Sequence, residues 1–141
     1  MYLQDLALTV LLVALAVAAL APIHTGALHG SVTVVGKATT PSGYAAVIVL
    51  ALAEEMLFRG FVAGLLFRRF GFRAGNALQA LVFFAPHLLL LLVSLSLWPI
   101  LPVPLAGGWL LGWLRQRSGS IGPGWIAHSI ANILASVILA L

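Results

Sequence analysis

Two adjacent carboxylates, Glu54 and Glu55, lie inside a long apolar segment of the chain, and Arg59 follows four residues after the second. Residues four apart share a helix face, so the spacing predicts an ion pair between Glu55 and Arg59, whereas Glu54 is rotated by about 100°. Each such charge costs about 2.5–3.5 kcal/mol at the centre of a membrane helix, where ionisable groups are functional by default. A purely structural ion pair would explain Glu55 and Arg59 but not Glu54.

Three further polar residues interrupt apolar segments: His87, and the pair His128 and Asn132, which are spaced four apart on one predicted helix face. The chain has no cysteine, and no serine or threonine is clearly paired with a base. The polar set therefore suits activation of water. A glutamate takes a proton from the water, a histidine assists, and histidine or asparagine donors stabilise the oxyanion that forms.

A zinc site is a second interpretation of the same residues. Two histidines and one glutamate are a known zinc ligand set, with water as the fourth ligand. The usual H-E-x-x-H helix is absent, however, because the glutamates and histidines come from three different segments. The residue types alone leave both the metal-free and the zinc interpretations open.

The elements that must position these residues are membrane helices. Of the 141 residues, 62% are hydrophobic and 7% are charged, whereas soluble domains carry about 25% charged residues. A spanning helix needs about 20 mostly apolar residues, and we find no alternating pattern typical of barrel strands. The prediction is an all-α, polytopic transmembrane helix bundle with about five membrane helices, at about 3–21, 44–67, 76–97, 99–114 and 121–141.

Basic residues predict the topology and the depth of the site. The net charge is +4, and the arginines cluster between apolar runs, at 68–73 and 115–117. This pattern marks a cytoplasmic side rather than a nucleic-acid partner. At 1.5 Å per residue, Glu54 and His87 both lie roughly 21 Å from these arginines along their helices, and His128 roughly 16 Å. Packing the three helices together should therefore gather their polar residues into one buried site.

The chain divides into residues 1–43, an N-terminal helix with an outer loop, and residues 44–141, the predicted catalytic core. The first helix has no basic n-region, so we favour a retained helix over a signal peptide. Two G-x-x-x-G pairs, Gly60 with Gly64 and Gly108 with Gly112, predict close approach of helix backbones.

The ordered motifs resemble a known family. Glu54 to Arg59 reads E-E-x-x-x-R, Phe83 to His87 reads F-x-x-x-H, and His128 to Asn132 reads H-x-x-x-N. In this order, on successive membrane helices, they are similar to the CAAX-prenyl-protease and bacteriocin-processing (CPBP, or Abi) family of intramembrane proteases. The resemblance covers about residues 44–139. Pro86, immediately before His87, predicts a kink in that helix.

The resemblance implies a role for each site residue. Glu54 would be the general base that activates water, with His87 as its partner, and Glu55 would tune the site through Arg59. His128 and Asn132 would bind the oxyanion, and Phe83 would serve packing. Members have been labelled metalloproteases, but the motifs fit a metal-free glutamate mechanism at least as well, and we favour the latter.

The resemblance also implies where the protein works and on what. The expected location is a prokaryotic plasma membrane, with a polar cavity that opens toward the cytoplasmic arginines. The expected substrate is a membrane-associated or C-terminal peptide, without a prenyl group carried over. A self-immunity or scaffold protein of the same family without proteolysis is the main alternative, and a small proton-coupled transporter is the next.

Overall fold

The computed structural model describes residues 3–8, 10–11, 38 and 40–138, and this part of the chain is helical without strands, which confirms the all-α prediction. Residues 3–8 and 10–11 are helical, and most of the first predicted membrane segment lies outside the described residues. The elements from residue 41 onward are α3 (Pro41–Glu55), the π-helix η3 (Met56–Val62), α4 (Ala63–Phe84), the 3₁₀-helix η4 (Ala85–Leu89), α5 (Leu90–Val93), the 3₁₀-helix η5 (Leu95–Ile100), α6 (Pro102–Ser118) and α7 (Gly122–Ile138).

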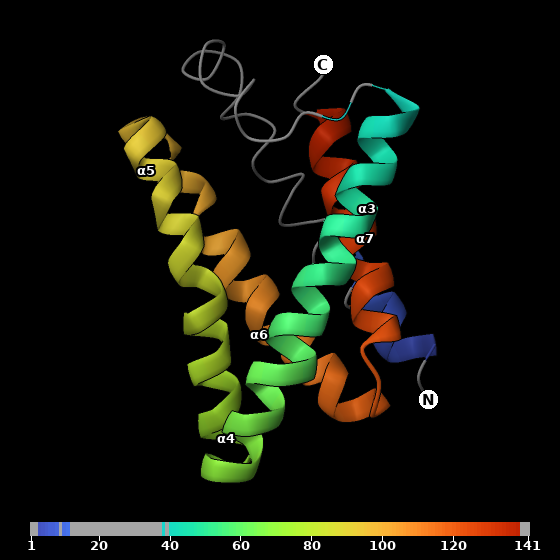
Figure 1. The fold of residues 1–141 in the computed structure, drawn as a ribbon, viewed down its shortest axis with the longest axis vertical. Coiled ribbons are helices and arrows are strands. Elements are labelled where there is room, and N and C mark those ends of the chain that lie inside the picture. Colours follow the sequence, from blue (N-terminus) through green and yellow to red (C-terminus); the bar gives the residue numbers. More distant parts are fainter. Residues whose placement is uncertain (1–2, 9, 12–37, 39, 139–141) are drawn as a thin grey trace.

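The chain reverses direction at Gly71 inside α4. This residue has φ 73° and ψ 172°, whereas its neighbours on both sides are helical. Glycine reaches a positive φ without the steric cost of a Cβ atom, so it can turn the chain without a separate loop. Figure 1 shows the two legs of this hairpin meeting at the lower end of the molecule. The predicted connection between the second and third membrane segments is therefore confirmed, but the third helix begins before Asn76.

Local sequence explains where the helices begin and end. Thr40 caps α3, because its Oγ1 accepts a hydrogen bond from the Gly43 N–H at 3.1 Å. Ser94 is extended, with φ −158° and ψ 131°, so α5 ends at Val93, four residues before the expected Leu97. Pro86 has no N–H to donate, and the α-helix gives way there to the tighter 3₁₀ turn of η4. In place of the predicted kink beside His87, the structure thus has a short 3₁₀-helix.

The helices pack as two principal pairs, α4 with α6 and α3 with α7, and α6 also contacts α7. Gly108 and Gly112 of α6 face α4. A Cβ atom on Gly108 would lie 3.2 Å from the Cα of Ala80, and one on Gly112 would collide with the side chains of Asn76 and Gln79. The close approach predicted for this glycine pair is confirmed.

The same prediction is wrong for Gly60 and Gly64. Among the described residues, the atoms within 4 Å of a Cβ built there belong to chain neighbours, Glu55 for Gly60 and Arg68 for Gly64, and not to a helix packed from elsewhere. The reason is their position: Gly60 is exposed and Gly64 is only partly buried, so neither glycine lies where two described helices meet.

Two helical runs are long and apolar enough to cross a membrane: Pro41–Val93 with 53 residues and Leu97–Ser118 with 22. Only 22% and 28% of their most apolar windows are buried within the protein. Large side chains such as Leu92, Leu95 and Trp98 are 65–82% exposed. An apolar surface of this kind is unfavourable in water but suits a lipid environment. The first run contains the reversal at Gly71, so it holds both legs of a hairpin.

Candidate active site

The last turn of α3 carries the two glutamates. Glu55 is completely buried, whereas the side chain of Glu54 keeps 28% of its surface exposed. Adjacent helix positions are rotated by about 100°, so that Glu55 faces the interior of the protein and Glu54 lies nearer its surface. Glu54 is consequently the carboxylate that the described residues leave partly uncovered.

Arg59 neutralises the buried glutamate. Its Nη1 lies 3.1 Å from Glu55 Oε1, and both side chains are completely buried. The ion pair predicted from the i, i+4 spacing is therefore confirmed. The Nη2 of Arg59 also donates to the backbone carbonyl of Gly108 in α6, at 3.4 Å. A charge at this depth needs such partners, because an unpaired buried charge is strongly destabilising.

His128 of α7 lies between the two carboxylates. Its Nδ1 is 3.0 Å from Glu55 Oε1, and its Nε2 is 3.4 Å from Glu54 Oε2. A neutral imidazole has one N–H and donates to one carboxylate at a time. Contact with both is favourable when the ring carries two protons, and the four groups Glu54, Glu55, Arg59 and His128 then sum to zero charge.

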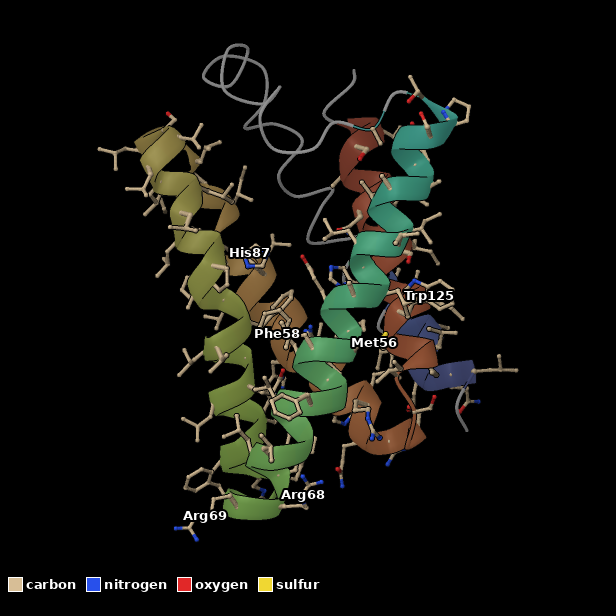
Figure 2. The ribbon with its side chains drawn as sticks, viewed as in Figure 1. Met56, Phe58, Arg68, Arg69, His87 and Trp125 are labelled. Atoms are coloured by element: carbon tan, nitrogen blue, oxygen red, sulfur yellow. The ribbon has the colours of Figure 1, made fainter. Side chains whose placement is uncertain are left out.

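His87 approaches the site from the other helix pair. Its Nδ1 lies 2.9 Å from the carbonyl oxygen of Phe83, and because a carbonyl can only accept, Nδ1 is the protonated nitrogen. In the neutral ring, Nε2 is then an acceptor. Figure 2 shows His87 on the α4–α5 leg and Phe58 on the α3 leg of the hairpin, with Arg68 and Arg69 near the turn that joins these legs. The described contact of Glu54 is with His128 and not with His87.

The ring of Phe83 joins these groups. Arg59 Cζ lies 4.1 Å from its centroid, a cation–π contact. The ring centroids of Phe58, His87 and His128 lie 5.0, 4.9 and 5.9 Å from that of Phe83. The sequence assigned Phe83 to packing, and the structure adds that this packing is against the arginine and both histidines of the predicted site.

Asn132 lies one turn beyond His128 on α7, and it is partly buried. Its backbone carbonyl accepts a hydrogen bond from Ser136 Oγ at 2.9 Å. Within the described residues, no hydrogen bond is formed by its side-chain amide. Asn132 thus follows His128 by one turn of α7, and within the described residues its amide forms no hydrogen bond with the other predicted site residues.

A sequence model of the type II CAAX prenyl endopeptidase Rce1-like family matches residues 36–134. The chain belongs to this family. Its match includes the E-E-x-x-x-R, F-x-x-x-H and H-x-x-x-N motifs, and the resemblance inferred from them is confirmed. No curated protein and no solved structure matches the chain. The family is one of endopeptidases, and with the two apolar helical runs its assignment makes this chain a membrane protein.

Sequence reasoning missed two buried polar residues of this Rce1-like chain, Asn76 and Gln79 of α4. Gln79 Nε2 donates to the Gly108 carbonyl at 2.7 Å and to Asn76 Oδ1 at 3.0 Å, and Asn76 Nδ2 donates to the Trp109 carbonyl at 3.1 Å. The Gly108 carbonyl thus accepts from both Gln79 and Arg59. The missed signal was periodicity, because Gln79, Phe83 and His87 repeat every four residues on one helix face.

The described residues do not fit a metal centre. In that part of the chain, no group of three or more His, Asp or Glu side chains is arranged to hold a metal ion. Both ring nitrogens of His128 are in contact with carboxylates, and Glu55 Oε1 is shared between His128 and Arg59. We therefore derive no catalytic step through a metal.

Proposed function

We propose that this protein is an intramembrane endopeptidase that hydrolyses a peptide bond with a water molecule activated by Glu54. The observation that supports this proposal most is the cluster of Glu54, Glu55, Arg59 and His128, which η3, α3 and α7 place within contact distance inside a membrane protein of an endopeptidase family. Charges at such depth are expensive and mark functional sites.

Glu54 is the better general base of the two glutamates. Glu55 is completely buried, and its Oε1 already contacts Arg59 Nη1 and His128 Nδ1. Glu54 is partly exposed and is in contact with His128 through Oε2, so its other carboxylate oxygen can accept a proton from water. Removal of that proton as the water oxygen attacks the peptide carbon is ordinary general base catalysis.

The remaining groups complete the hydrolysis. His87 Nε2, an acceptor by its hydrogen bond to Phe83, orients the water. The Asn132 amide and the His128 Nε2–H stabilise the oxyanion, the latter by exchanging its longer contact with Glu54. The proton taken by Glu54 then passes to the leaving nitrogen as the C–N bond breaks, which regenerates the carboxylate. No metal takes part in these steps.

The setting of this reaction is also a proposal. The core spans residues 44–141, and with the N-terminal segment it forms a bundle of about five membrane helices in a prokaryotic plasma membrane. The positive-inside rule puts Arg68, Arg69 and Arg73 on the cytoplasmic side, from which a polar cavity would admit a membrane-associated or C-terminal peptide.

The test is peptide cleavage by the purified full chain in detergent. A pooled library of membrane-anchored and C-terminal peptides is read by mass spectrometry, with and without a chelator. Glu54→Gln should lower the rate about 10²–10⁴-fold, the usual contribution of a general base. Asp5→Asn is the matched control, since it makes the same carboxylate-to-amide change at a residue paired with Arg117, and it should cleave like the wild type.

The outcomes separate the alternatives. Cleavage that is lost in Glu54→Gln and kept with chelator supports the metal-free glutamate mechanism. Loss in both conditions would make the protein a metalloenzyme. Equal cleavage by Glu54→Gln and the wild type would overturn the proposal and favour an immunity or scaffold role.

A further inference from the structure

One oxygen of Glu55 faces a glycine. Glu55 Oε2 is completely buried and has no hydrogen-bond partner among the described residues, because Arg59 and His128 both contact Oε1. A Cβ atom built on Gly124 would lie 2.8 Å from Oε2 and 3.6 Å from the carboxylate carbon. Gly124 is itself buried and is the third residue of α7.

A side chain at this position cannot coexist with the observed carboxylate. Heavy atoms that are not bonded pack best at about 3.5–4.0 Å, so an alanine at 124 forces either α7 or Glu55 to move. The end of a glutamate side chain yields more readily than a helix backbone. Glu55 would then leave its place between Arg59 and His128.

We infer that Gly124 is a positioning residue of the active site, because its lack of a side chain leaves the space that the Glu55 carboxylate occupies. The inference rests on the proposed function, in which the place of Glu55 determines how Arg59 and His128 are held. It requires a residue without a side chain at position 124, a requirement that is not part of the E-E-x-x-x-R, F-x-x-x-H and H-x-x-x-N motifs.

The substitution Gly124→Ala should impair chemistry rather than folding. Alanine forms helices better than glycine, so the helix itself loses nothing. A displacement of about 1 Å at a catalytic group can cost about 100-fold in rate. We expect kcat to fall by about 10–100-fold, with KM close to that of the wild type and the protein still folded at the temperature of the assay.

Gly122→Ala provides the matched control in the same turn of α7. A Cβ atom there would meet Ser120 Oγ at 3.5 Å, an ordinary contact. The kcat of this variant should stay close to that of the wild type. If Gly122→Ala and Gly124→Ala lose the same activity, the effect belongs to the flexibility of the turn and the inference is overturned.

Rescue by a shorter carboxylate tests the contact itself. Glu55→Asp withdraws the carboxylate by one methylene, so adding Gly124→Ala to this variant should cause little further loss of kcat. An equal loss in both backgrounds would contradict the inference. The same four proteins are also compared by detergent unfolding, where non-additive stabilities indicate contact and additive ones refute it. This second comparison decides the contact even if the wild type cleaves none of the peptides, a result that would count against the proposed function alone.

Discussion

The two helix pairs of this protein are held together in different ways. Between α4 and α6, glycines let the backbones approach, and neutral amides of Asn76 and Gln79 donate to carbonyls of Gly108 and Trp109. Small residues and interhelical hydrogen bonds of this kind are the usual means of packing helices in a membrane, where burial of apolar surface does not drive association.

Between α3 and α7, by contrast, the described polar contacts include the ionisable cluster. His128 contacts both glutamates, and Trp125 Nε1 donates to the Ile48 carbonyl at 3.0 Å. The two pairs therefore differ in what they contribute: α4 and α6 form a neutral, closely packed support, and α3 and α7 hold the groups that can exchange protons. Arg59 connects them, since it contacts Glu55 and the Gly108 carbonyl.

Removal of this connection should have the largest effect. Arg59→Met leaves Glu55 buried beside His128 without its arginine, and loss of one partner of a buried pair costs about 3–5 kcal/mol. Unfolding in detergent measures this loss. Arg69→Met, at an exposed position near the turn, is the control and should be nearly neutral. Equal stability of the two variants would show that Arg59 does not connect the pairs.

The next largest effect is expected from disturbing the packing of α4 against α6 without any change of charge. Gly112→Ala introduces a methyl group into the space of the Asn76 and Gln79 side chains, and overpacking of this kind costs about 1–3 kcal/mol. Gly107→Ala, which meets nothing within 4 Å, should cost nothing. Thermal unfolding compares the two, and a Gly112→Ala protein as stable as Gly107→Ala would contradict the close packing described for α4 and α6.

The smallest expected loss of stability concerns the Trp125 hydrogen bond between α3 and α7. Trp125→Phe removes the indole N–H from the Ile48 carbonyl, and hydrogen bonds between membrane helices average about 0.6 kcal/mol. Trp109→Phe, at a side chain that is 43% exposed, gives the baseline for loss of an indole. If both substitutions cost the same in detergent unfolding, the Trp125 hydrogen bond does not help to hold α7 against α3.

Much of the core could be predicted because its signals are local or periodic. Rare charges in an apolar segment identified Glu54, Glu55 and Arg59, and similar distances from the arginines predicted that His87 and His128 lie at similar depth. The structure brings Glu54, Glu55, Arg59 and His128 together and places His87 against Phe83. The catalytic roles assigned to these residues remain predictions.

The features that escaped prediction depend on partners in distant segments. Gly60 and Gly64 have the same spacing as Gly108 and Gly112, but only the latter pair lies where two described helices meet. Gln79 does not stand out in the sequence by its residue type. Its importance is visible only in the structure, where it donates to the Gly108 carbonyl of another helix. The space beside Gly124 likewise depends on Glu55, which lies 69 positions earlier in the chain.

The ring of Phe83 has a consequence for the strength of the ion pair. Because it covers the guanidinium of Arg59 with carbon atoms, it keeps water away from that side and puts a group of low dielectric constant there. Coulomb attraction at a given distance is about four times stronger at an effective dielectric constant of about 20 than in bulk water at about 80. An uncharged aromatic side chain therefore helps to determine how firmly Glu55 is held, by controlling the medium through which its charge acts.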